Sequence, residues 1–264
     1  MKTFIRFASG LILAAMSQTA SAQVFEVIHP DVIEGGFEFE VLNGVVLDSV
    51  EDGEERSAHE IAIGYSPFSF WKTTFAIEIG NPENESAEFE AFEWENVLLL
   101  PFGSHAEGND HDHGGGSFFE LGAVGLYVAL EVPNEGGIGS GGVEVGPIAE
   151  LQFGPVETVA NLFVEIPFED GEDPGLAYAL SAAVPIAEFE PVELSAGFEA
   201  FGGAEGAFGD APPLGENSHV IGPALYSEID IGRGRVLEPR LAVLFGLTDG
   251  SPDAALSFNI ELKF

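Results

Sequence analysis

Glutamates alternate with apolar residues along many segments of this chain, and they are its most frequent chemically active side chains. The segment Phe37–Val41 reads FEFEV, so that Glu38 and Glu40 fall on one parity and the apolar residues on the other. A β-strand with this pattern has one apolar and one acidic face. If such acidic faces met inside a closed structure, rows of carboxylates would attract cations and repel anions.

The same parity argument identifies the residues that we expect to line an interior. They are the carboxylates Glu38, Glu40, Glu60, Glu78, Glu157, Glu165, Glu193, Glu199, Glu238 and Glu261, together with the cations Arg240 and Lys263. We expect Arg240 to pair with neighbouring acids such as Glu238 and Glu261 and to narrow the interior. The alternative is that the acids only hydrate an interior or pair with the few bases, since the inner surfaces of such structures are generally polar.

A second candidate site lies in Ser104–Ser117, which reads SHAEGNDHDHGGGS. Imidazole and carboxylate groups lie close together there and suit Zn²⁺, Ni²⁺ or Cu²⁺ more than a cation bound by oxygen alone. The candidate ligands are His105, Asp110, His111, Asp112 and His113. No fixed ligand spacing is present, so an incidental polar tract is the alternative. Beyond a weakly bound divalent metal here, the sequence predicts no cofactor.

Enzymatic activity is not expected. The chain has no nucleophile elbow, P-loop or H-E-x-x-H motif, each of which would mark a particular reaction.

Twelve alternating segments must position these side chains. They are Phe37–Gly44, Ser57–Tyr65, Phe70–Ile79, Glu88–Leu100, Phe118–Val132, Val143–Phe153, Val156–Ile166, Leu176–Phe189, Val192–Phe201, His219–Ile231, Val236–Leu247 and Ala254–Phe264. Most approach or exceed the roughly 10 residues that a strand needs to cross a bilayer, whereas strands of soluble sandwiches are commonly about 5–6 residues long. The sequence therefore predicts an all-β fold, a transmembrane up-and-down antiparallel β-barrel of about 12 strands.

The connections between these segments alternate in length. The second, sixth, eighth and tenth connections, such as Gly154-Pro155 and Glu190-Pro191, are short, whereas the odd-numbered ones, such as Val45–Arg56 and Pro167–Gly175, are longer or richer in acid. Outer-membrane barrels have this asymmetry, with short periplasmic turns and longer outer loops. The His tract forms the fourth connection and is therefore expected on the periplasmic side.

Two local features conflict with regular strands. Four prolines lie inside the predicted segments, at positions 147, 185, 223 and 239, and the apolar parity slips between Phe89 and Trp94. Proline removes a donor from the hydrogen-bond ladder, and an extra residue shifts parity, so we expect bulges or misplaced boundaries at these points.

Composition and export signals restrict the possible partners. The chain has 8 Lys and Arg against 45 Asp and Glu, a net charge of −37, which excludes nucleic acid because binding a polyphosphate requires basic residues. A saline habitat would also explain this acidity. Residues 1–22 have the basic start, apolar run and small-residue end of a secretory signal peptide, which leaves 23–264 as one barrel domain.

The last strand suggests a family. Asp253–Phe264 alternates and closes on a terminal aromatic residue, and it resembles the C-terminal signature of Gram-negative outer-membrane barrels, which is read by the barrel-assembly machinery. The segments Phe92–Asn96, Gly222–Tyr226 and Leu244–Asp253 resemble largely uncharacterised barrels grouped with outer-membrane proteins of phenol-degradation pathways. This resemblance implies a transporter-like channel in the bacterial cell outer membrane, with no established substrate and with a hydrophobic or aromatic solute as a competing cargo.

We therefore expect a barrel channel for passive passage of small neutral or cationic solutes through an acidic lumen. Its expected partners are outer-membrane lipid and lipopolysaccharide, the barrel-assembly machinery, and small solutes or cations. The alternative is a non-conducting binding or structural barrel, which handles divalent metal through the His tract or cross-links lipopolysaccharide through cations. In either case the strand Leu256–Phe264 must pair with Phe37–Gly44, because a membrane barrel has no free edges.

Overall fold

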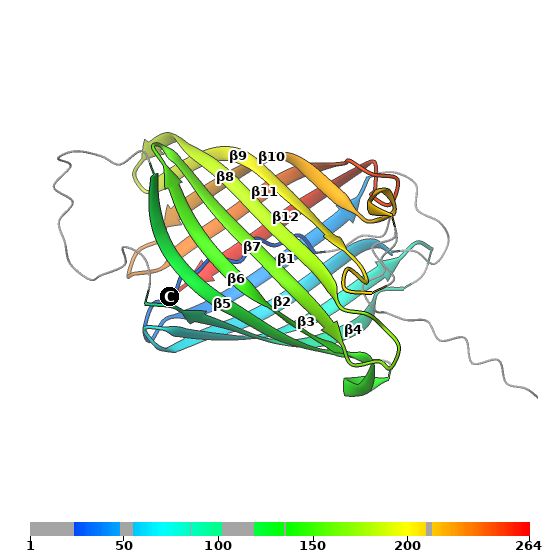
Figure 1. Cartoon of the computed structure of the whole chain (residues 1–264). Helices are drawn as coiled ribbons and strands as arrows, with labels where there is room; N and C mark the ends of the chain where they lie inside the picture. The colour runs from blue at the N-terminus through cyan, green and yellow to red at the C-terminus, as the bar shows by residue number, and fades with distance from the viewer. Residues whose placement is uncertain (1–23, 48–54, 85, 102–118, 135, 210–212) are drawn as a thin grey trace, which may run out of the picture.

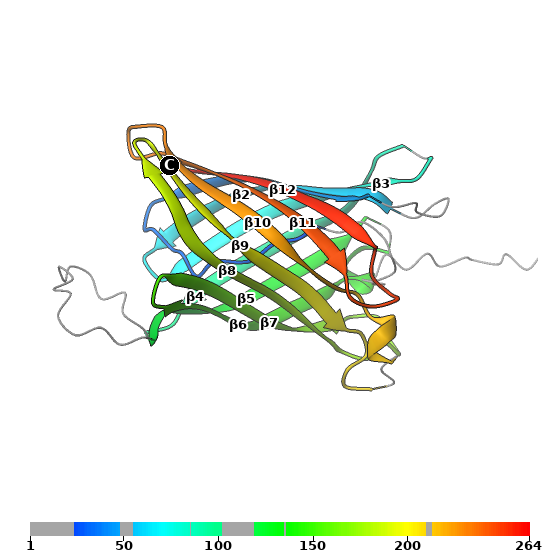
Figure 2. The same cartoon turned by 90° about the horizontal axis from the view of Figure 1, so that it is seen from above.

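Twelve antiparallel strands close into one barrel, as predicted (Figures 1 and 2). The structure is a computed structural model that describes residues 24–47, 55–84, 86–101, 119–134, 136–209 and 213–264. The strands are β1 Phe37–Val46, β2 Glu55–Phe68, β3 Trp71–Pro82, β4 Glu88–Leu99, β5 Phe119–Pro133, β6 Gly142–Phe153, β7 Val156–Pro167, β8 Gly175–Phe189, β9 Val192–Ala204, β10 His219–Asp230, β11 Val236–Gly246 and β12 Ala254–Lys263. Two short 3-10 helices, η1 Gly137–Ser140 and η2 Leu214–Glu216, lie in connections. Within the described ranges, no helix is long and apolar enough to cross a membrane.

The seam of the barrel lies between β1 and β12, as the sequence predicted. Glu38 pairs with Lys263 and Glu40 with Glu261 in an antiparallel register. At the end of the seam, Phe37 N–H donates to Phe264 O at 2.8 Å and Phe264 N–H donates to Phe37 O at 2.9 Å. The last residue of the chain therefore completes the ladder that removes both sheet edges.

The outer surface of the barrel is apolar. Large side chains such as Ile63, Leu162 and Phe198 expose more than half of their area, while small and polar side chains of the opposite parity, such as Ala62 and Asn161, are buried. Exposed apolar and enclosed polar faces are the reverse of a soluble protein and suit a barrel that spans a bilayer. Apolar and polar residues alternate in the sequence because successive residues of each strand face the outside and the interior in turn.

The predicted irregularities have two different outcomes. The register shifts between Pro185 and Ala187, and it also shifts in β4 where the predicted parity slip occurs, so bulges are confirmed at both places. Pro147, Pro223 and Pro239 have no bulge, because the register on each side of them is unchanged. A glycine precedes Pro147 and Pro223, and any Cβ on it would clash with a backbone carbonyl of the next strand. The Gly-Pro pairs therefore allow close strand approach while the register is kept.

The two ends of the barrel are distinguished by their connections. Strands β6 and β7 and strands β8 and β9 are joined by two-residue turns at the end where β1 begins and β12 ends, and the sidedness of such barrels makes this the periplasmic end. The opposite end is called the outer end below. The last residues of β4 and the first of β5 lie at the periplasmic end, but the candidate metal ligands His105, Asp110, His111, Asp112 and His113 lie outside the described residues.

Candidate functional site in the barrel interior

The interior contains a segment that the sequence did not single out, residues 24–36, called the N-terminal segment below. Val24 packs beside Val46 and Ala58 at the outer end. At the periplasmic end, Gly35 N–H donates to Ser66 O at 2.7 Å and Ser66 N–H donates to Gly36 O at 3.0 Å. The segment therefore runs the length of the interior before β1 begins, as the blue coil inside the barrel shows in both views (Figures 1 and 2).

Apolar contacts hold the outer and middle parts of this segment. Phe25 is only 2% exposed and packs against Phe201, with 5.3 Å between the ring centroids, and against Leu244. Ile28 packs with Tyr127 and Phe163 on the inner wall. The inner wall is therefore not uniformly polar, because buried apolar residues of β7 to β12 form a surface that accepts Phe25.

Hydrogen bonds from wall side chains satisfy the backbone of the segment. The side chain of Asn161 on β7 forms two hydrogen bonds with the backbone of Ile28. Ile28 N–H donates to Asn161 Oδ1 at 2.8 Å, and Asn161 Nδ2 donates to Ile28 O at 2.8 Å. Arg240 Nη2 and Asn259 Nδ2 both donate to Phe25 O at 3.0 Å. A coil inside a barrel has no neighbouring strand to satisfy it, so buried polar side chains provide the partners that it needs.

Arg240 points inward as expected, but the predicted partners were wrong. Its Nε lies 2.9 Å from Oε1 of Glu199, and Tyr226 Oη donates to the same oxygen at 2.8 Å. Glu238 and Glu261 instead face Lys263, at 3.2 Å and 3.5 Å. Lys263 thus contacts those two acids, whereas Arg240 extends toward Glu199 and the Phe25 carbonyl.

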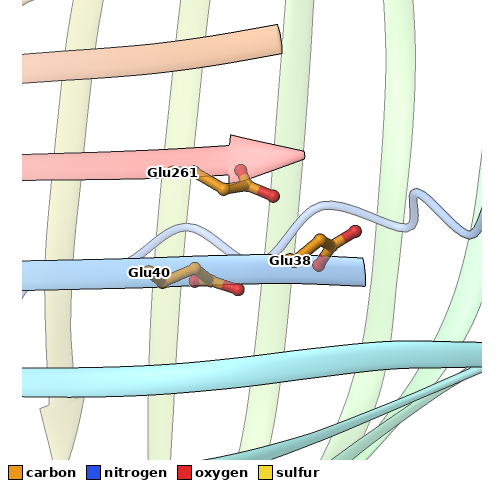
Figure 3. Close-up of side chains that lie close together, drawn as sticks. All are labelled: Glu38, Glu40 and Glu261. Carbon is orange, nitrogen blue, oxygen red and sulfur yellow. The ribbon is translucent and has the colours of Figure 1, made fainter. Parts of the chain in front are cut away.

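Three carboxylates meet near the periplasmic end, on β1 and β12 (Figure 3). Oxygen atoms of Glu38, Glu40 and Glu261 lie within 4.8 Å of one another. Two cations lie beside them. Lys72 Nζ is 2.8 Å from Glu38. Lys263 Nζ is 3.2 Å from Asp31 of the N-terminal segment and also contacts Glu238 and Glu261 on the wall. These three carboxylates, called the seam cluster below, are therefore compensated only in part by Lys72 and Lys263.

A second group of carboxylates lies on β2, β3 and β4 and comprises Glu60, Glu78 and Glu93, called the Glu60 cluster below. Their oxygens also lie within 4.8 Å of one another. Glu60 faces Glu78 directly in the β2–β3 register. Nearby, Tyr127 Oη donates to Glu95 at 2.6 Å. The acids are thus distributed along one wall from the outer half of the barrel to the seam.

The remaining predicted residues are dispersed. Glu157 and Glu193 are exposed at the periplasmic ends of β7 and β9, whereas Glu165 lies near the outer end of β7. Sequence reasoning missed Glu93 and Glu95, because the β4 bulge shifts parity immediately before them. Val97, near the end of β4, is buried on the inner face. Counting back from it in steps of two would have placed both residues on that face.

Comparison with known proteins supports the fold. No protein-family model and no curated protein matches the sequence. The crystal structure of the COG4313 outer membrane channel from Pseudomonas putida F1 superposes with a TM-score of 0.58 at 12% identity, covering 90% of this chain and all of that one. The fold is that of an outer-membrane β-barrel. The translocator domain of autotransporter NalP from Neisseria meningitidis is less similar, with a TM-score of 0.44, 13% identity and 89% coverage of each chain. The likeness to the COG4313 outer membrane channel confirms, for the fold, the predicted resemblance to transporter-like outer-membrane barrels.

Proposed function

We propose that the protein is an outer-membrane channel that passes small cations and small neutral solutes by diffusion, without catalysing a reaction. The observation that carries this proposal is the distribution of carboxylates along the inner wall, from the Glu60 cluster to the seam cluster. Lys72, Arg240 and Lys263 compensate only part of this charge. Rows of acids along a narrow path lower the energy of a cation and raise that of an anion.

The N-terminal segment sets the width of this path. It packs on the apolar wall near Phe201 and Leu244, while its Asp31 forms an ion pair with Lys263 on the acidic side. A barrel of about 12 strands is narrower than the open porins of 16–18 strands. A docked segment therefore favours passage of small solutes and excludes large ones. The structural likeness to an outer membrane channel supports the same class of function.

Planar-bilayer recording tests the proposal, with charge neutralisation at the seam cluster as the perturbation. The variant E38Q/E40Q/E261Q is expected to keep a measurable conductance but to lose much of its preference for K⁺ over Cl⁻. The control variant E169Q/D170N/E172Q removes the same formal charge from the β7–β8 connection and is expected to keep the preference. If both variants retain the selectivity of the original chain, the seam cluster does not control ion passage.

One observation favours a second candidate, the non-conducting binding or structural barrel. The N-terminal segment is anchored by buried hydrogen bonds at Phe25 and Ile28, and its side chains fill space inside the barrel. If the segment never leaves this position, an occluded barrel would carry no current. Complete absence of conductance from protein that is shown to be folded in the bilayer would support this candidate over the channel.

A further inference from the structure

The Glu60 cluster differs from the seam cluster in how its charge is compensated. In the seam cluster, Lys72 and Lys263 reach the carboxylates within 2.8 Å and 3.5 Å respectively. Within the described part of the chain, no Lys or Arg forms an ion pair with Glu60, Glu78 or Glu93. Glu95 lies two residues after Glu93 on the same face of β4, so the next inward side chain of that strand is also a carboxylate.

Glu60 is the most enclosed member of this cluster. It is 5% exposed, and none of the ion pairs formed among the described residues includes its carboxylate. Buried carboxylates are normally paired or hydrogen-bonded, because removing a charge from water without compensation is costly. One oxygen of Glu60 instead lies within 4.8 Å of an oxygen of Glu78 and of an oxygen of Glu93. A cation bound between these oxygens would stabilise carboxylates that are enclosed in this way.

The spacing of the oxygens suits one bound ion. Ca²⁺ binds oxygen at about 2.3–2.6 Å, so two ligands of the same ion are separated by at most about 5 Å. All three residues have a carboxylate oxygen within that limit, since their separations do not exceed 4.8 Å. Mg²⁺ suits three carboxylates less well, because it demands near-ideal octahedral geometry and is usually bound through only one or two carboxylates. Donors that are all oxygen also favour a hard cation over Zn²⁺ or Cu²⁺.

We propose that the Glu60 cluster is a divalent-cation site that takes Ca²⁺, with Glu60, Glu78 and Glu93 as ligands and water at the remaining positions. The register holds two of these ligands in place, because Glu60 and Glu78 are direct cross-strand partners on β2 and β3. Glu93 approaches from β4, where Ala76 is its cross-strand partner. The bound ion would cross-link three neighbouring strands of the wall. This site does not depend on whether the barrel conducts.

Calorimetric titration with CaCl₂ tests the proposal. The full-length chain, refolded into detergent free of lipopolysaccharide and stripped with a chelator, is expected to bind one equivalent of Ca²⁺ at this site. The variant E60Q/E78Q/E93Q is expected to lose that binding, and the single variant E93Q to weaken it by about tenfold or more, since each carboxylate is a direct ligand. The control E38Q/E40Q/E261Q removes the same charge from the seam cluster and is expected to retain the site.

Thermal unfolding supplies a second readout that does not depend on resolving the heat of binding. Ca²⁺ is expected to raise the unfolding temperature of the original chain and of the control, but not of E60Q/E78Q/E93Q, because an ion that binds only the folded barrel stabilises it. The proposal is overturned if the original chain binds no Ca²⁺, or if both triple variants lose binding equally. A barrel that binds Ca²⁺ here but carries no current would refute the channel and leave this site intact.

Discussion

Replacing Asn161 by alanine should release the N-terminal segment from the wall. The side chain of Asn161 is 1% exposed, and it makes both a donor and an acceptor bond to the backbone of Ile28. At about 0.5–1.5 kcal/mol for each hydrogen bond, its loss destabilises the docked segment by about 1–3 kcal/mol. The undocked population should therefore rise by roughly 5–150-fold.

A single cysteine can report this change, because the natural chain contains none. Val27 of the segment is 7% exposed, and Cys is a small side chain that packs as a hydrophobe. In Val27→Cys, a bulky maleimide reacts only when the segment leaves the wall, so the labelling rate follows the undocked population if redocking is fast. Adding Asn161→Ala should raise this rate by the factor derived above.

The matched control for this experiment is Asn96→Ala. Asn96 also uses its side-chain amide, as it accepts a bond from Trp71 Nε1 at 3.0 Å, but its partner belongs to the wall. The labelling rate should hardly change in this variant. An unchanged rate in Asn161→Ala would refute the role given to Asn161, and an equal rise in both variants would indicate general loosening of the barrel.

Three further substitutions probe the wall. Arg240→Ala should lower the free energy of unfolding by about 3–5 kcal/mol, because Glu199 is left as an uncompensated buried charge. The urea midpoint measures this loss, and adding Glu199→Gln should recover part of it. Leu162→Arg should cost about 2–4 kcal/mol in vesicles, since that side chain faces outward near the middle of β7 and is 52% exposed. Phe264→Ala should reduce the fraction of folded barrel in cell membranes, because it removes the terminal aromatic residue that stacks on Phe37 at 5.9 Å.

Each of these substitutions has a control at a comparable position. Arg235→Ala removes a cation from the periplasmic turn, and Phe168→Arg places a cation in the connection after β7. Phe245→Ala removes an exposed aromatic side chain from β11, away from the terminal position. The controls are expected to have small effects. Equal losses in a variant and its control would show that position in the barrel does not account for the result.

The strands and the seam could be predicted from the sequence because alternation records burial directly. A residue such as Leu162 faces lipid and its neighbour Asn161 faces inward, so the twelve segments and the pairing of the last strand with the first follow from parity. The ends of the strands were predicted less accurately than their number. For example, β2 continues to Phe68, beyond the predicted end at Tyr65, through a register irregularity that breaks the alternation.

The N-terminal segment could not be predicted because its sequence has neither the two-residue alternation of a strand nor the 3.6-residue repeat of a helix. It forms neither a helix nor a strand, and its partners lie far away in the sequence: Asn161 is 133 residues from Ile28, and Arg240 is 215 residues from Phe25. The partner of Arg240 was wrong for a related reason. Parity assigns a side chain to the inner face, but it does not specify which of several acids on that face lies closest.

The reversal potential of the folded barrel in a KCl gradient tests the central claim most directly. An inner wall with carboxylates at the Glu60 cluster and the seam cluster predicts a potential displaced toward the value for K⁺. The displacement should shrink as the salt concentration rises, because salt ions screen the charge of the inner wall. A potential displaced toward the value for Cl⁻, or a folded barrel that carries no current, would contradict the proposed cation-conducting channel.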